Sequence, residues 1–332
     1  MRGAITVLRF IDEAHRRGER TALVAIARVI GSSSRDPGAL MAVSESGAWC
    51  GSLSGGCVEA AVVGEARRAI EQRQAELLRL GAGSPLIDIR LPCGGGLDLL
   101  IVPGPDAGAV ARALHLLDRR QTVAVVTGLD GLFMASAAEP ARRADWDGAV
   151  LTLRIDPVLR IVAIGQGEEV VALSRQGLAY GADVLALTPD PGAADLVTHI
   201  GAMAHRLLTP ALSPLLHTDV ATAVIFLFHD HDWEQTLLRQ ALDQPALFIG
   251  AMGSRRTHTL RLEALRAAGV PEPQLARIEG PIGLIPMTRD PATLALSVLA
   301  QVAGRYQVHR DRLFKTAGNR ITDHTLGIET AN

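Results

Sequence analysis

The chain has 332 residues, of which 33 are Lys or Arg and 35 are Asp or Glu, so its formal net charge is −2. This length favours about two domains, and the 48% of hydrophobic residues is enough to build folded cores. The near-neutral charge and the 3% of aromatic residues argue against a nucleic-acid-binding protein, because such proteins need a basic surface or aromatic stacking platforms.

Only one of the cationic residues is a lysine, Lys315. Because Lys315 follows Phe314 rather than glycine, the chain has no Walker A loop, and P-loop chemistry is excluded. An anionic ligand must therefore be bound by arginine, by backbone amides or by both.

The longest strongly apolar segment, residues 220–228, is too short to span a bilayer. The N-terminus lacks the pattern of a signal peptide. The three cysteines, Cys50, Cys57 and Cys93, are odd in number and form no CxxC pair, which favours reduced thiols over disulfides. We therefore expect a soluble cytoplasmic protein with neither a membrane nor a nucleic acid as its partner.

The first half of the sequence is predicted to form an α+β domain over residues 1–155. Strands are expected at 21–30, 39–43, 48–53, 86–91, 97–102, 122–127 and 150–153, and helices at 57–74 and 107–120. Short strands joined by glycine and proline turns are typical of antiparallel sheets with helices packed against them.

The second half alternates strands with helices and is predicted to form a Rossmann-like domain over residues 156–305, of α/β class. Strands are expected at 160–164, 184–187, 223–228 and 246–249, and helices at 168–180, 193–200, 233–242, 254–268 and 291–303. This alternation predicts a doubly wound parallel sheet. The boundary is expected near Asp156-Pro157, and residues 306–332 are expected to form a polar tail.

The first motif with chemical content places Gly55 and Gly56 before Cys57 and Glu59, at the start of a predicted helix. Glycines let backbone amides approach an anion, and the positive end of the helix favours negative charge. Cys57 would gain thiolate character there. A glycine turn with a small buried cysteine explains the same pattern equally well.

A second glycine-flanked cysteine is Cys93, which is followed by Gly94, Gly95 and Gly96. Such a thiol is open to a bulky ligand, although a tight hairpin also uses glycines. Two such cysteines in one domain favour a thiol site shared by Cys57 and Cys93. No further ligand with the spacing of a zinc site accompanies them.

The predicted strand at 160–164 ends in Gly165-Gln-Gly167, which is the context of a dinucleotide-binding turn. Glu168 and Glu169 place negative charge where a pyrophosphate would bind, and Thr188 stands where the ribose-binding acidic residue is expected. The pattern predicts a Rossmann fold and argues against NAD as its ligand.

His229 and His231 follow another predicted strand. Alternate residues of an extended chain face the same side, so the two imidazoles could converge on one ligand or metal. The carboxyl end of a strand in an open α/β sheet is a common ligand-binding position. The more ordinary interpretation is a polar loop that precedes the next helix.

The last motif is a glycine turn with Gly250 and Gly253, after which Ser254 can cap a helix that begins with Arg255 and Arg256. Two arginines beside the positive end of a helix are unfavourable unless an anion is bound. A phosphate would pair with backbone amides and arginine together, whereas the alternative is a solvated arginine pair. The compact loop 281–284 is expected to form the neighbouring wall.

Together these segments resemble the XdhC/CoxI family, accessory proteins that mature molybdenum hydroxylases such as xanthine dehydrogenase. The resemblance is carried by residues 31–39, 51–59, 93–96, 165–167, 228–231, 249–256 and 281–284. It implies a molybdenum-cofactor chaperone rather than an enzyme. Such a chaperone would bind molybdopterin or its cytosine dinucleotide form, protect it during sulfuration by a cysteine desulfurase, and insert it into an apo-molybdenum hydroxylase.

In that interpretation Cys57 and Cys93 bind the cofactor and lie near molybdenum. The other cofactor-binding residues are Gly55, Gly56, Glu59, Gly94, Gly95, Gly165, Gly167, His229, His231, Gly250, Gly253, Ser254, Arg255 and Arg256. Two alternatives remain open from the sequence. One is an NAD(P)-dependent oxidoreductase, and the other is a sulfur-relay protein that uses Cys57 and Cys93. The sequence does not fix the oligomeric state, and a homodimer is one option.

Overall fold

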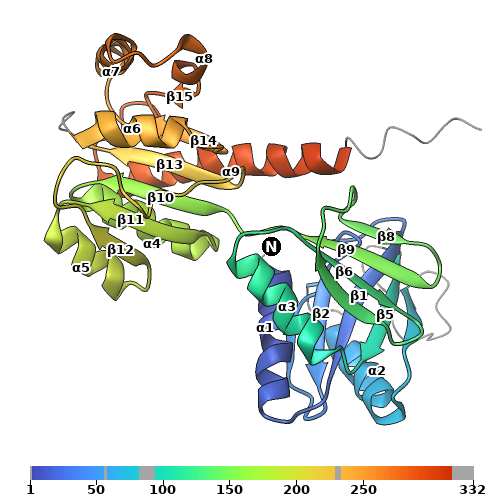
Figure 1. Cartoon of the computed structure of the whole chain (residues 1–332). Coiled ribbons are helices and arrows are strands. Elements are labelled where there is room, and N and C mark those ends of the chain that lie inside the picture. The colour runs from blue at the N-terminus through green and yellow to red at the C-terminus, as the bar shows by residue number, and fades with distance from the viewer. Residues whose placement is uncertain (1, 56–57, 82–93, 229–232, 316–332) are drawn as a thin grey trace, which may run out of the picture. The chain divides into compact units, whose positions relative to one another are not determined.

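The computed structural model describes residues 2–55, 58–81, 94–228 and 233–315 (Figure 1). They form two compact units, one running up to Pro157 and the other from Val158 to Arg312. No helix in the described ranges is both long and apolar enough to cross a lipid bilayer. Several predictions lie outside these ranges, namely the strand at 86–91, the tail beyond 315 and the site residues Gly56, Cys57, Cys93, His229 and His231.

The first unit contains two antiparallel sheets. In its described residues the larger sheet has the order β3-β2-β1-β5-β4, and the smaller has the order β7-β6-β9-β8. The larger sheet comprises β1 (Thr21–Ile30), β2 (Leu40–Ser44), β3 (Trp49–Gly51), β4 (Glu76–Gly81) and β5 (Gly96–Pro103). The smaller sheet comprises β6 (Val123–Gly128), β7 (Phe133–Ala137), β8 (Ala144–Trp146) and β9 (Val150–Ile155).

Helices cover both faces of the larger sheet, which confirms the predicted α+β class. The helices are α1 (Arg2–Arg16), α2 (Glu59–Gln72) and α3 (Ala107–Asp118). Within β1, Ala22, Val24 and Ile26 belong to the core formed with α2, whereas Leu23 and Ala25 belong to the core shared by α1, α3 and the smaller sheet (Figure 1). Because both faces of β1 are buried, the strand is apolar along most of its length.

Helix α1 was not among the predicted elements. Val7, Leu8, Ile11 and Ala14 are fully buried and recur at helical spacing. The helical spacing of these apolar residues is therefore present in the sequence of the N-terminal segment.

The second unit contains one parallel sheet. Its described strands are β10 (Arg160–Gly165), β11 (Asp183–Thr188), β12 (Met203–Arg206), β13 (Thr222–Leu227), β14 (Phe248–Ala251) and β15 (Ile278–Glu279). They pair in the order β12-β11-β10-β13-β14-β15, and all the pairings are parallel. Counted along this unit, the order is 3-2-1-4-5-6, which is that of the doubly wound Rossmann fold. The predicted fold class is confirmed.

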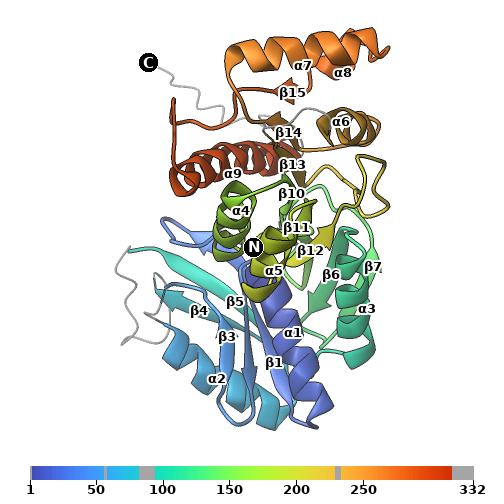
Figure 2. The ribbon, with the colours of Figure 1, turned by 90° about the vertical axis from the view of Figure 1, so that its left-hand side faces the viewer.

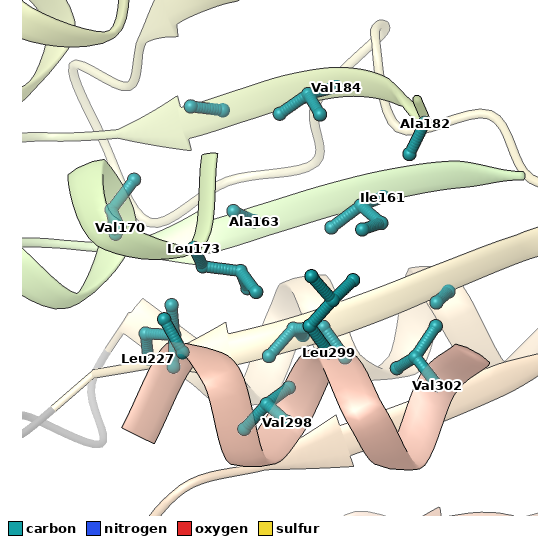
Figure 3. Close-up of a cluster of buried hydrophobic side chains, with 14 of the residues drawn as sticks. Ile161, Ala163, Val170, Leu173, Ala182, Val184, Leu227, Val298, Leu299 and Val302 are labelled. Atoms are coloured by element: carbon teal, nitrogen blue, oxygen red, sulfur yellow. The ribbon is translucent and has the colours of Figure 1, made fainter. Parts of the chain in front are cut away.

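Helices pack on both faces of this sheet, and Figure 2 shows α4 and α9 on one side with α6 on the other. The helices are α4 (Glu168–Tyr180), α5 (Pro191–His199), α6 (Glu234–Leu242), α7 (Arg255–Ala267), α8 (Glu272–Leu275) and α9 (Pro291–Lys315). In the core on the first side, Leu173 of α4 and Leu299 and Val302 of α9 pack with Ile161 and Ala163 of β10 (Figure 3).

The last helix extends further than the sequence suggested. It was expected to end at residue 303 and to be followed by a polar tail from 306, but α9 continues to Lys315. Val302 and Tyr306, one helical turn apart, are both buried in the core on the α4 side of the sheet. This extra turn of apolar contact explains why the helix continues past residue 303.

The end of β10 tolerates only glycine, because the backbone of β13 passes very close to it. A Cβ on Gly165 would collide with the carbonyl group of Leu227. Gly165→Ala is expected to lower the free energy of unfolding by about 1–3 kcal/mol, as overpacked sites do. Urea denaturation of the purified variants measures this change.

The matched control is Gly304→Ala, since Gly304 is exposed inside α9 and nothing lies within 4 Å of the added Cβ. Alanine there is expected to raise stability by about 0.5–1 kcal/mol. Equal urea midpoints for the wild type and Gly165→Ala would contradict the close approach of β13.

Candidate functional site

The loop before α2 is organised around the buried carboxylate of Glu59, the first residue of that helix. Its Oε1 accepts hydrogen bonds from Ser52 Oγ (3.1 Å) and from the amides of Leu53 (3.1 Å), Ser54 (3.0 Å) and Gly55 (3.2 Å). Its Oε2 accepts from Ser54 Oγ (2.8 Å) and from the amide of Val58 (3.2 Å). The anion expected at this glycine turn is therefore supplied by the protein itself.

The electrostatics of Glu59 follow from these contacts. Burial alone would raise the pKa of the carboxyl group, but hydrogen bonds from the Ser54 amide and hydroxyl and from the Leu53 amide outweigh it and lower the pKa to about 2. Glu59 is thus ionised at neutral pH. Its organising role was not apparent from the sequence, which suggested a ligand-binding residue.

The described residues beside Cys57 and Cys93 meet at one segment of the first unit, residues 31–34. Ser34 Oγ donates to the carbonyl oxygen of Ser54 at 3.2 Å. Gly95 lies so close to the carbonyl oxygen of Ser32 that a Cβ would not fit. The sequences next to both cysteines are therefore neighbours, although the cysteines themselves lie outside the described ranges.

Protein carboxylates also lie at the glycine turn after β10. Gly167, with φ of 78°, immediately precedes α4 and donates its amide to Asp190 Oδ2 at 3.3 Å. The other oxygen of Asp190 accepts from two amides in the first turn of α5. Glu168 and Glu169 occupy the first turn of α4. Carboxylates thus stand where a dinucleotide pyrophosphate would bind, and the contact between Asp190 and Gly167 could not be read from the sequence.

The turn between β14 and α7, in contrast, is followed immediately by positively charged side chains and no carboxylate. Gly253 has φ of 131°, and Ser254 Oγ accepts the Thr257 amide at 3.1 Å, which caps the helix as predicted. The first turn of α7 contains no acidic residue. Arg255 and Arg256 are exposed, and neither forms an ion pair with any residue that the structure describes.

A cavity of about 850 Å³ opens beside this turn, beyond the carboxyl ends of β13 and β14. One wall carries Gly253, Ser254, Arg255 and Thr257, and the other consists mainly of apolar residues of the loop 281–288. The sequence predicted the contribution of 281–284 to this wall. Arg256 is not among the lining residues, and Gly250 lies inside β14, where Phe248 and Ile282 leave no room for a side chain.

A buried ion pair supports the β14–α7 turn. Arg261 Nε and Nη2 donate to the two carboxylate oxygens of Glu234 at 2.9 and 3.1 Å, and Nη2 also donates to the Met252 carbonyl at 2.8 Å. The two side chains are only 3% and 2% exposed. Because Glu234 begins α6 and Met252 lines the cavity, the pair links two loops at the ligand-binding edge of the sheet.

No metal site is evident in the described ranges, where no group of three or more His, Cys, Asp or Glu side chains could hold an ion. Cys50, the described cysteine, is half-buried, and burial raises the pKa of its thiol, which disfavours the thiolate. The metal hypotheses for Cys57, Cys93, His229 and His231 stay predictions.

The architecture is that of a two-unit protein, an α+β unit followed by a Rossmann unit. Comparison with known families places the XdhC Rossmann domain on residues 161–302 and the XdhC and CoxI family on residues 14–81. The molybdenum cofactor insertion chaperone PaoD of Escherichia coli is 35% identical over 90% of this chain and 87% of its own length. The chain belongs to the XdhC and CoxI family, as its sequence motifs predicted.

The chain is also similar to two further proteins. The uncharacterized protein YqeB of Escherichia coli is 23% identical over 89% of this chain and 46% of its own length. A crystal structure described as a xanthine dehydrogenase from Bacillus halodurans matches with a TM-score of 0.73 at 19% identity, covering 91% of this chain and 96% of that one. The latter similarity supports the fold.

Proposed function

We propose that this chain is a molybdenum-cofactor chaperone. It binds a molybdopterin-type cofactor, protects it while a cysteine desulfurase supplies the terminal sulfur, and inserts it into an apo-molybdenum hydroxylase. The named function of PaoD, similar over most of both chains, supports this role. In this proposal the chain acts as an accessory protein and catalyses no reaction of its own.

The observation that carries the proposal is the cavity beside the β14–α7 turn. Its polar wall offers the helix start at Ser254 and the guanidinium of Arg255, which suit a phosphate. Its apolar wall, from the loop 281–288, suits an uncharged ring system. A molybdopterin, or its cytosine dinucleotide form, has both kinds of group.

The other two glycine turns support this choice of site. Glu59 accepts the amides of the turn before α2, and Asp190 accepts the amide of Gly167. A carboxylate already satisfies these donors, whereas Arg255 lines an open cavity. The contact at Gly167 also disfavours the alternative of an NAD(P)-dependent oxidoreductase, because the pyrophosphate of NAD would have to displace Asp190.

Arg255→Ala is expected to weaken retention of the molybdenum cofactor about tenfold or more, since charge-assisted hydrogen bonds to phosphate contribute about 1.5–3 kcal/mol. Retention is measured by releasing the pterin from gel-filtered protein and identifying its nucleotide. Arg175→Ala is the matched control, because Arg175 is an exposed arginine of α4 in the same unit.

Three results would contradict the proposal. One is wild-type protein that retains no pterin under conditions in which hydroxylase activation proceeds. Another is micromolar binding of NADH, which would favour an oxidoreductase. The third is a persulfide on Cys57 or Cys93 without bound pterin, which would favour a sulfur-relay protein.

A further inference from the structure

A cluster of two arginines and one aspartate lies on the larger sheet of the first unit. Arg28 of β1 and Arg79 of β4 both stand opposite Asp98 of β5, the strand between them. A bulge between Ile26 and Arg28 shifts the register of β1, and such bulges re-aim side chains. The three charged groups therefore form one row across three neighbouring strands.

The contacts within the row are close. Arg79 holds Asp98 through two hydrogen bonds, Nε to Oδ1 at 2.6 Å and Nη2 to Oδ2 at 2.8 Å. Arg28 Nε reaches Oδ2 at 2.8 Å, and its Nη2 lies 2.7 Å from the same oxygen. Both arginines therefore turn the Nε and Nη2 edge of the guanidinium toward one carboxylate.

This arrangement leaves positive charge at the surface. Asp98 is 1% exposed, whereas the side chains of Arg28 and Arg79 are 56% and 35% exposed. Two cations share one anion, so the cluster carries a net charge of +1. The Nη1 group of each arginine has no partner among the residues that the structure describes.

Glycines lie next to the row on the same face of the sheet. Two residues further along each strand, on the same face of the sheet, Ile30 of β1 and Gly81 of β4 both pair with Gly96 of β5. Two of these three residues have no side chain. Ser32, just after β1, contacts Gly95. The arginine row thus lies close to Gly95, which follows Cys93 by two residues in the sequence.

We propose that Arg28 and Arg79 bind a phosphate group, as the free ion or as a phosphate monoester. Each guanidinium can donate from Nη1 while Asp98 holds its other edge in place. Planar guanidinium groups suit phosphate oxygens, and a pre-oriented pair loses little conformational entropy on binding. The site belongs to the first unit, shares no residue with the β14–α7 cavity of the second unit, and does not depend on whether the chain carries a pterin.

The test uses inorganic phosphate and the full chain with Arg255→Ala and Arg256→Ala, which removes the arginines of the second unit. Isothermal titration in a low-chloride buffer is expected to show phosphate binding to this variant. Adding Arg28→Gln is expected to weaken that binding about tenfold or more. Arg79 still pairs with Asp98 in this protein, so the fold is retained, which circular dichroism checks.

Two further variants make the result specific. Arg17→Gln removes another exposed arginine of the first unit that pairs with one carboxylate, Glu19, and is expected to leave phosphate binding unchanged. Asp98→Asn raises the cluster charge from +1 to +2 and is expected to tighten binding. The inference is wrong if phosphate does not bind the protein lacking Arg255 and Arg256, or if Arg28→Gln binds it equally well. Neither result bears on pterin retention, which tests the proposed function separately.

Discussion

Glu234→Ala is expected to lower the free energy of unfolding of the second unit by about 3–5 kcal/mol, because it leaves the guanidinium of Arg261 buried without its counter-ion. Arg261 is 3% exposed, so water cannot replace the lost carboxylate. Urea unfolding followed by circular dichroism measures the change, with the two units treated as separate transitions where they resolve.

A matched control is the ion pair between a second arginine of α7 and a glutamate of α8. Arg266 pairs with Glu272, but those side chains are 49% and 67% exposed. Glu272→Ala is therefore expected to change the free energy of unfolding only slightly, because exposed ion pairs contribute little. If Glu234→Ala and Glu272→Ala lowered the free energy of unfolding by similar amounts, burial would not be the reason that the Glu234–Arg261 pair matters for stability.

A double replacement separates stability from positioning. Glu234→Leu with Arg261→Met removes both charges and is expected to recover much of the lost stability, as apolar replacements of buried ion pairs often do. It cannot restore the hydrogen bond to the Met252 carbonyl, which holds the β14–α7 turn. Retention of the cofactor is therefore expected to stay low in the double variant. Full recovery of retention would mean that Arg261 acts only through stability.

The fold could be predicted because it depends on local patterns. In the second unit, strands and helices alternate at regular spacing, and right-handed crossovers leave few possible topologies for such a chain. The parallel pairing of β10, β11, β13 and β14 agrees with this prediction, whereas the short edge strands β12 and β15 were not predicted. In the first unit, short strands such as β7 and β8 have mixed burial and little periodicity, so they were not predicted.

The candidate site could be predicted only in part. The β14–α7 turn was readable because its glycines, its capping serine and its arginines are consecutive. The partners of Glu234 and Gly167 are 27 and 23 residues away along the chain. Contacts between separate elements depend on how the sheet brings them together, and no local pattern encodes them. For the same reason, the arginine pair at Asp98 became visible only from the strand register.

The glycine turn before α2 was expected to bind a ligand, but its amides bind the carboxylate of Glu59. Glu59→Gln is expected to lower the free energy of unfolding at pH 7 by about 3 kcal/mol, the equivalent of lowering the carboxyl pKa from 4.5 to about 2. A glutamine has only one acceptor oxygen, so the NH2 group that replaces Oε2 cannot accept from the Ser54 hydroxyl or from the Val58 amide. Glu71→Gln, at an exposed position of the same helix, is expected to have little effect.

The pH dependence gives the same prediction a second test. Because folding lowers the pKa of Glu59, its stabilisation is complete above pH 4.5 and is lost as the pH falls toward 2, where the folded state also binds the proton. Glutamine has no such titration. The stability difference between the wild type and Glu59→Gln is therefore expected to shrink steadily from pH 5 to pH 3 in urea denaturation. A difference that stays constant over this range would show that the carboxylate charge is not what holds the loop.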